Sequence, residues 1–236
     1  MVRVNLRNIT QHELALRTAT ALVLGAIALF MTLYDVYTFY ALVIIVAGLM
    51  FAEWFELTSF NKWVQRLGGL AYIGLPAFSL IALRTYPVQV ETQIEPNTLL
   101  IQTEYSAVLV IYLFAMVWAT DIAAFFAGKT FGKHKLAPTL SAGKTWEGLA
   151  GGVVAASIVG LLGAFFSPYP QTLWGGLLIG AVIAIVGQIS DLFESALKRR
   201  AGVKDSGTFL PGHGGILDRV DALIFTAPLF ALLALL

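Results

Sequence analysis

Apolar residues in this chain occur in long blocks rather than at the three- to four-residue spacing of an amphipathic helix. Seven blocks approach or reach the length of a helix that crosses the roughly 30 Å apolar core of a bilayer. They cover residues 18–34, 36–52, 68–84, 104–122, 147–166, 172–190 and 217–236. Asp35 separates the first two, and one helix through both would far exceed the bilayer thickness. The pattern predicts an all-α, polytopic integral membrane protein with about seven transmembrane helices and short loops, eight or nine being the alternative count.

Composition agrees with a membrane protein. The chain is 58% hydrophobic and 12% charged, whereas soluble domains have about 25% charged residues. It contains no cysteine, which excludes disulfides and thiolate metal sites. We expect two regions: 1–103, with the N-terminal transmembrane helices and an external loop at 85–103, and 104–236, a C-terminal catalytic transmembrane region with the polar motifs.

The cations predict the orientation in the membrane. With seven crossings, one side holds the N-terminal arm and the loops 53–67, 123–146 and 191–217. That side has 14 of the 15 Lys and Arg residues, and the other side has only Arg84. Because short basic loops stay in the cytoplasm, we predict a multi-pass protein of the cell membrane with this face inside.

Carboxylates lie at the predicted inner ends of neighbouring spans. Asp191 ends one span, and Asp218 and Asp221 begin the next, three residues apart and so on one helix face. Such a cluster needs a cation, and oxygen ligands favour Mg²⁺ or a similar hard ion. Asp121, at the inner end of an earlier span, is a further candidate. The alternative is that these residues only anchor helix ends at the membrane surface.

Basic residues and glycines accompany the carboxylates. Lys198, Arg199 and Lys204 can neutralise phosphate oxygens, although Lys204 could equally be attracted to anionic lipid headgroups. The glycine-rich stretch GTFLPGHGG permits positive φ and close backbone approach, as a phosphate-binding loop requires. Lys144 precedes a predicted helix start, where backbone N–H groups also favour anions.

The polar positions between Ser195 and Asp221 resemble the signature of the phosphatidate cytidylyltransferase (CDP-diacylglycerol synthase) family. The matching positions are Ser195, Lys198, Arg199, Lys204, Asp205, Pro211, His213, Gly214, Gly215, Asp218, Arg219 and Asp221. The stretches 121–125, 128–133 and 141–148 also resemble the family, except that Ser141-Ala142 stands where Ser-Pro is usual. So many polar positions at fixed spacing make the resemblance specific over roughly residues 115–225.

The resemblance implies transfer of CMP from CTP to phosphatidate, which gives CDP-diacylglycerol and pyrophosphate, with Mg²⁺ and with K⁺ as a further candidate ion. It also implies a homodimer in membrane lipid and no nucleic-acid partner. The expected metal ligands are Asp191, Asp218 and Asp221. The expected catalytic residues, which hold phosphates or order the loop, are Lys144, Lys198, Arg199, Asp205, His213 and Arg219. The expected substrate-binding residues are Asp121, Ser195, Lys204, Gly214 and Gly215.

Two other functions use similar residues. A CTP-dependent membrane lipid kinase, such as a polyprenol kinase, would use the same metal and nucleotide chemistry but transfer the γ-phosphate. An ion-coupled transporter would also embed carboxylates, but it would spread polar residues through the middle of the spans. Here they gather at one face.

Overall fold

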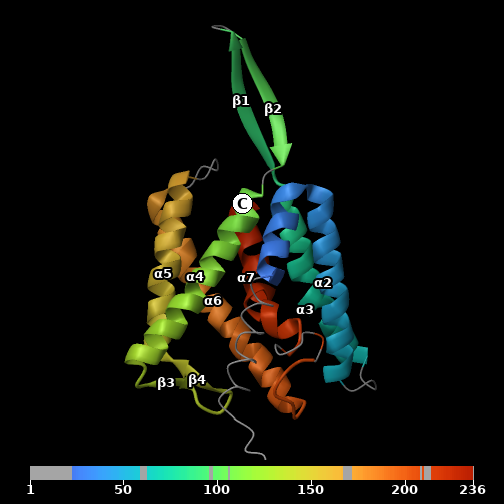
Figure 1. Ribbon diagram of the computed structural model, residues 1–236, viewed down its shortest axis with the longest axis vertical. Coiled ribbons are helices and arrows are strands. Elements are labelled where there is room, and N and C mark those ends of the chain that lie inside the picture. Colours follow the sequence, from blue (N-terminus) through green and yellow to red (C-terminus); the bar gives the residue numbers. More distant parts are fainter. Residues whose placement is uncertain are drawn as a thin grey trace, which may run out of the picture.

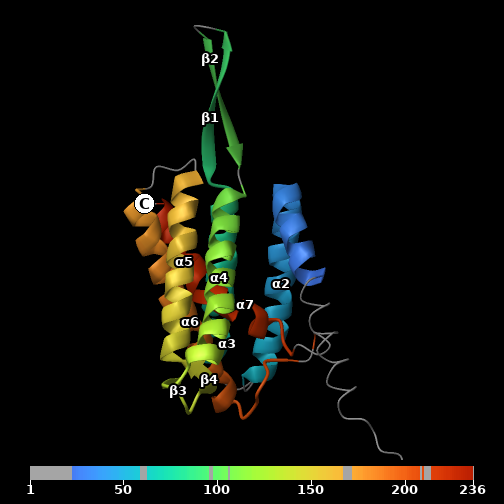
Figure 2. The same ribbon diagram turned by 60° about the vertical axis from the view of Figure 1, so that its left-hand side comes forward.

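The computed structural model describes residues 23–58, 63–95, 98–105, 107–166, 172–207, 209 and 214–235. In these ranges the chain forms a helical bundle (Figures 1 and 2). The helices are Val23–Tyr34, α2 (Val36–Leu57), α3 (Trp63–Arg84), α4 (Val108–Phe131), α5 (Trp146–Phe166), α6 (Leu173–Arg200) and α7 (Leu217–Leu235). Each predicted apolar block therefore corresponds to a helix.

Asp35 separates the first two helices because its side chain caps the second one. The Asp35 carboxylate accepts a hydrogen bond from the backbone N–H of Tyr37 at 3.0 Å, a common way to satisfy a free donor at a helix start. Figure 1 shows Val23–Tyr34 and α2 side by side and joined at this point. The chain reverses direction here, as the sequence predicts.

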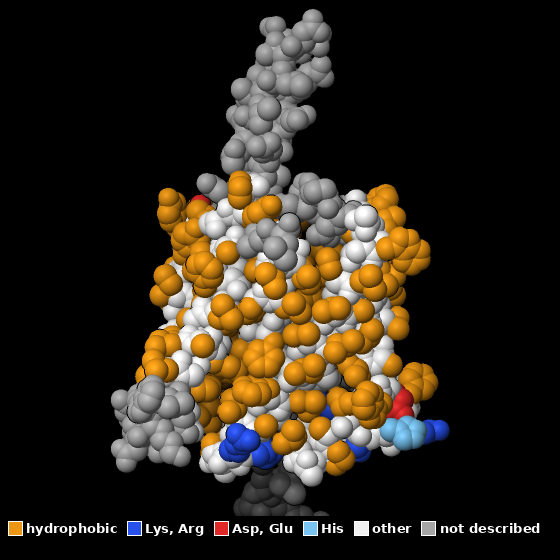
Figure 3. Space-filling model, turned by 180° about the vertical axis from the view of Figure 1, so that it is seen from behind, with side chains coloured by type: hydrophobic (Ala, Val, Ile, Leu, Met, Phe, Trp, Pro, Cys, Tyr) orange, Lys and Arg blue, Asp and Glu red, His pale blue; other side chains and the backbone are white. Residues whose placement is uncertain are grey.

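Five of the described helices, α2 to α6, are long and apolar enough to cross a membrane. Val23–Tyr34 is shorter, and α7 has Asp218, Arg219 and Asp221 in its first turns. Figure 3 shows hydrophobic side chains over most of one face of the bundle. The chain is thus a helical membrane protein, whereas the predicted count of seven crossings is not confirmed.

Two β-hairpins accompany the predicted helical bundle. β1 (Pro87–Glu95) pairs with β2 (Thr98–Tyr105), and β3 (Lys135–Ala137) pairs with β4 (Ser141–Thr145). The first hairpin stands out from the bundle where the sequence predicts a plain loop (Figures 1 and 2). The alternation in PVQVETQIE has the period of a strand, a signal that the block-by-block interpretation did not use.

Of the described helices, α4 and α6 extend furthest beyond the predicted blocks. α4 continues from residue 122 to Phe131, and α6 continues from residue 190 to Arg200. The expected inner loops are therefore shorter, and Ser195, Lys198 and Arg199 lie on a helix instead of a loop. For α6 the reason is that polar residues do not by themselves end a helix, whose backbone hydrogen bonds form within it.

Charge gathers at the end of the bundle opposite to β1–β2. Figure 3 shows Lys and Arg side chains at this end of an otherwise apolar surface. β3–β4, the C-terminal end of α6 and the start of α7 lie toward it in Figure 1. We call it the charged end. Arg84 is on the other side, where its Nε donates to the buried backbone oxygen of Thr32 at 3.2 Å.

Glycines let α5 and α6 pack closely. A Cβ on Gly180 would lie 2.1 Å from the backbone oxygen of Ala156, and one on Gly176 would lie 2.4 Å from that of Gly160. Small residues at such contacts are typical of membrane helices, whose association depends on close packing because lipid is as apolar as the side chains. This hairpin positions the inner part of α6.

Substituting Gly180 by Ala should therefore lower thermal stability. The new Cβ meets backbone, which cannot rotate away, so we expect about 1–3 kcal/mol of destabilisation and a lower melting temperature in detergent. A Cβ on Gly48 of α2 would meet nothing within 4 Å, so Gly48→Ala is the matched control. Equal melting temperatures for the two variants would contradict the close packing of α5 and α6.

A second contact joins the N-terminal helices to the start of α7. Met50 and Trp54 of α2, Ile73 of α3, and Leu217 and Ile224 of α7 form a buried apolar cluster. Each is less than a tenth exposed. The charged end is thus assembled from both halves of the chain.

Candidate active site

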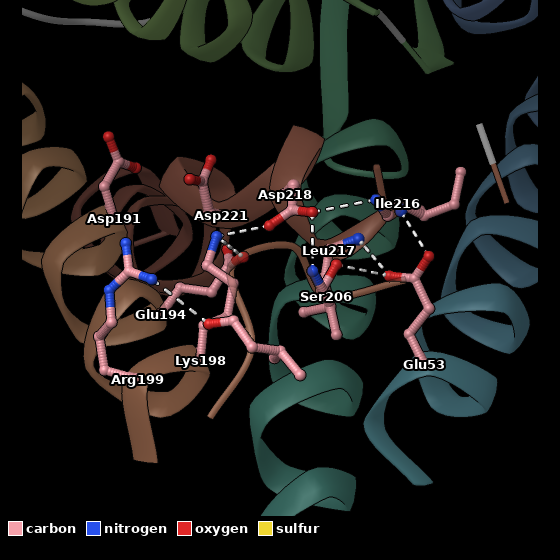
Figure 4. A network of polar contacts seen from close by, with 12 residues as sticks. Glu53, Asp191, Glu194, Lys198, Arg199, Ser206, Ile216, Leu217, Asp218 and Asp221 are labelled. Atoms are coloured by element: carbon pink, nitrogen blue, oxygen red, sulfur yellow. Dashed lines mark hydrogen bonds and ion pairs between the residues drawn. The ribbon is translucent and has the colours of Figure 1, made fainter. Parts of the chain in front are cut away.

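Four carboxylates lie together where α6 packs against α7 at the charged end (Figure 4). Asp191 and Glu194 belong to α6, and Asp218 and Asp221 belong to α7. We call these four residues the acidic cluster. The sequence predicts three of them, and Glu194 is the addition from the structure.

Lys198 connects the two helices of the acidic cluster. Its Nζ lies 2.9 Å from Glu194 Oε1 and donates to Asp218 Oδ1 at 2.5 Å. The side chains of Glu194 and Asp218 are only 2% and 8% exposed. Removing one partner would therefore leave an uncompensated charge away from water.

The other oxygen of Asp218 organises the loop before α7. Asp218 Oδ2 accepts hydrogen bonds from the backbone N–H groups of Ser206 and Gly215, both at 2.9 Å. Gly214 has φ +81°, a left-handed conformation that glycine adopts without steric cost. Gly214 thus uses the conformational freedom that the glycine-rich stretch offers.

Lys144 connects β4 to α6. Its Nζ donates to Asp191 Oδ2 at 2.8 Å across 47 positions of sequence. This ion pair brings the 141–148 stretch to the acidic cluster. Thr145 and Glu147 hold the neighbouring turn, since Thr145 Oγ1 accepts from Gly148 N–H and Glu147 accepts from His134 Nδ1 at 2.7 Å.

A small cavity lies beside Asp191. Its lining includes Thr120 and Asp121 of α4, and Gly187, Gln188 and Asp191 of α6. Asp121, a predicted substrate-binding residue, is thus on the same cavity as Asp191. Asp191 Oδ1 is buried and has no hydrogen-bond partner among the described residues.

The three predicted metal ligands are not arranged around one point. Within the described part of the chain, no three Asp, Glu or His side chains are placed to hold one metal ion. Both oxygens of Asp218 are occupied by Lys198 and backbone donors. Asp221 Oδ1 accepts from the N–H of Ala222 at 2.9 Å.

The chemistry of the acidic cluster nevertheless fits a divalent cation. When ionised, its four carboxylates face two ammonium groups, Lys144 and Lys198, which leaves two negative charges unbalanced. The donor atoms are carboxylate oxygens, the type that Mg²⁺ prefers. The unpartnered Asp191 Oδ1 is a buried acceptor that a cation would satisfy.

The other predicted residues differ in their exposure to solvent. Arg199, Lys204, Asp205 and Arg219 are exposed, and Ser195 is half-buried. Arg199 Nη1 donates to the backbone oxygen of Val203 at 3.4 Å. Gly214 and Gly215 lie beside Asp218, and His213 is outside the described residues.

Sequence reasoning missed two carboxylates. Glu194 lies three residues after Asp191 and four before Lys198, so helical spacing would have placed it on their face if α6 had been extended past residue 190. Glu53 lies within an apolar helix and is fully buried. An ionisable residue in such a span is a functional candidate by itself.

Comparisons with known proteins identify similar sequences. The model of the cytidylyltransferase family matches residues 69–236. The chain is 36% identical over 251 residues to a phosphatidate cytidylyltransferase of Brucella suis, with 93% of each chain covered. It is 38% identical over 197 residues to one of Rickettsia bellii, covering 81% of this chain and 78% of the relative. One of Staphylococcus haemolyticus is 47% identical over 124 residues, covering 52% and 48%.

Proposed function

Because the chain belongs to the cytidylyltransferase family, we propose that the acidic cluster and its lysines carry out transfer of CMP from CTP to phosphatidate. The products are CDP-diacylglycerol and pyrophosphate. The observation that supports this assignment is the Lys144–Asp191 ion pair, because it joins two motifs that are far apart in the sequence at the acidic cluster. The kinase and transporter alternatives are not favoured by the names of the relatives.

The position of the acidic cluster suits a lipid substrate and a water-soluble one. We propose that the charged end faces the cytoplasm, since the predicted topology puts nearly all of the cations of the chain on that side. With Val23–Tyr34 and α7 counted, the helices then make seven crossings. The acyl chains of phosphatidate can remain in lipid while CTP arrives from the cytosol. A homodimer is proposed on the family resemblance alone.

The lipid phosphate supplies the nucleophile. One of its anionic oxygens forms a bond to the α-phosphorus of CTP, and the bond from that phosphorus to the bridging oxygen of pyrophosphate breaks. No strong general base is required, so positioning and charge neutralisation dominate. In the proposal, Lys144, Lys198, Arg199 and Arg219 neutralise phosphate oxygens, and the loop around Gly214 and Gly215 positions them.

Roles are also proposed for the remaining predicted residues. Asp205 and His213 would order the loop or the cytidine end of the nucleotide. Asp121, Ser195 and Lys204 would contact the substrates, with Asp121 on the cavity beside Asp191.

We further propose that Asp191, Asp218 and Asp221 hold Mg²⁺, with K⁺ as a second ion implied by the resemblance alone. Bound Mg²⁺ would neutralise charge on the phosphate oxygens and on the departing pyrophosphate. The unbalanced negative charge of the acidic cluster supports a divalent ion there. Lys144 and Lys198 keep these carboxylates paired and oriented.

Labelled CTP tests the reaction directly. Purified protein in detergent, with phosphatidate and Mg²⁺, should transfer label from α-labelled CTP into lipid and none from γ-labelled CTP. Only attack at the α-phosphorus leaves that atom in the lipid product. Lipid labelled from γ-labelled CTP would replace the proposal by the kinase alternative, and omission of Mg²⁺ should prevent transfer.

A further inference from the structure

Glu53 is a buried carboxylate that none of the roles above uses. It belongs to α2 and its residue is 0% exposed. Its Oε1 accepts from the N–H of Ile216 at 2.7 Å, and its Oε2 accepts from the N–H of Leu217 at 2.9 Å. The hydroxyl of Ser206 also donates to Oε2, at 3.0 Å. Figure 4 shows Glu53 reaching these donors from α2.

Glu53 thus caps α7 from another helix. The first N–H groups of a helix have no partner within it, and its N-terminal end attracts negative charge. Ile216 and Leu217 stand at this end of α7, and a residue 163 positions away satisfies the N–H of Ile216. The carboxylate therefore determines where α7 begins relative to α2.

The loop is built closely around the Glu53 carboxylate. A Cβ on Gly207 would lie 2.7 Å from Glu53 Oε1, and one on Gly215 would lie 2.5 Å from Oε2. Neither glycine has a positive φ, so side-chain contacts favour glycine at these two positions rather than backbone conformation. Glu53 makes such a contact at both, and at Gly215 the Ser206 hydroxyl would lie even closer to a Cβ, at 1.9 Å. The glycine-rich stretch is shaped here by a protein carboxylate.

Glu53 and Asp218 hold the same loop from opposite sides. Ser206 donates its N–H to Asp218 and its hydroxyl to Glu53. Gly215 donates to Asp218, and the next N–H, that of Ile216, goes to Glu53. Any displacement of the loop from Glu53 would therefore also displace the donors that orient Asp218.

We propose that Glu53 is a positioning residue for the cytidylyltransferase reaction: it anchors the start of α7 and the Ser206 turn, and thereby the Asp218 carboxylate and Lys198. The inference rests on the proposed function for its link to catalysis. Anchoring itself is a property of the fold and is measured separately. The N-terminal helices then contribute to the active site as well as to membrane insertion.

Glu53→Gln keeps the size of the side chain but puts an NH₂ group where backbone N–H donors require an acceptor. We expect kcat to fall about 10- to 100-fold, as is typical when a residue that orients a ligand is changed, with little change in KM for CTP or phosphatidate. Amide hydrogen exchange should become faster in peptides that cover Ser206 and 214–218 and stay unchanged in α4 and α5. Ser206→Ala, which loses only one of the contacts, should show a smaller effect of the same kind.

Glu56 provides the matched control, since it is exposed on the same helix three residues away. Glu56→Gln should match the wild type in kcat and in exchange. The inference is overturned if Glu53→Gln has wild-type kcat, or if its exchange rises equally in all helices, which would indicate general destabilisation. If the wild type makes no CDP-diacylglycerol, the proposed function fails, whereas local exchange in Glu53→Gln still decides the anchoring.

Discussion

Asp218→Asn should lower kcat/KM about 10²- to 10³-fold, the range found when one preorganised electrostatic contact is removed from an active site. Asp218 uses one oxygen for Lys198 and the other for two backbone N–H groups. An amide has only one acceptor oxygen, so either Lys198 or the loop loses its partner. The substitution also removes the charge that pairs Lys198 across α6 and α7.

The measurement is steady-state formation of CDP-diacylglycerol by purified protein, with the melting temperature recorded for each variant. Asp35→Asn is the control. It makes the same acid-to-amide change at a residue away from the charged end, and Asn caps a helix about as well as Asp. It should keep both activity and stability. Wild-type turnover by Asp218→Asn would remove Asp218 from the proposed site.

Asp191→Asn and Lys144→Met should both reduce activity, but they should differ in their dependence on Mg²⁺. We expect Asp191→Asn to lower kcat/KM by about 10³-fold or more and to raise the Mg²⁺ concentration needed for half-maximal rate. The substitution removes the negative charge of the carboxylate whose Oδ1 is buried and unpartnered. Lys144→Met should lower kcat/KM for CTP about 10²-fold without raising that Mg²⁺ concentration. A lysine competes with a cation for the carboxylate and does not bind the metal.

Direct Mn²⁺ binding, followed by electron paramagnetic resonance, separates metal binding from turnover. Binding should weaken in Asp191→Asn and persist in Lys144→Met. If both substitutions weaken Mn²⁺ binding equally, the Lys144–Asp191 pair has a purely structural role. The double variant completes the cycle and measures how strongly the two side chains are coupled.

Hydrophobic patterning alone predicted the helices because a bilayer leaves few options. A span in lipid must satisfy its own backbone hydrogen bonds, so an apolar block of sufficient length becomes a helix. Asp35 divides the first two blocks for a local reason of its own, since its side chain caps the helix that follows. The pattern failed outside the lipid: β1–β2 and the polar extension of α6 to Arg200 lie where the apolar blocks give no information.

The motif between Ser195 and Asp221 likewise indicated the family by resemblance and two members of the acidic cluster, Asp218 and Asp221, while Asp191 was predicted from its place at the end of an apolar block. What the tertiary structure decided is which charges meet: Lys144 with Asp191, Lys198 with Glu194 and Asp218, and Glu53 with the start of α7. Sequence spacing predicts contacts within one helix, whereas these pairs join different elements. They depend on how α2, α6 and α7 pack, and that packing follows from side-chain shape and buried hydrogen bonds rather than from the order of residue types.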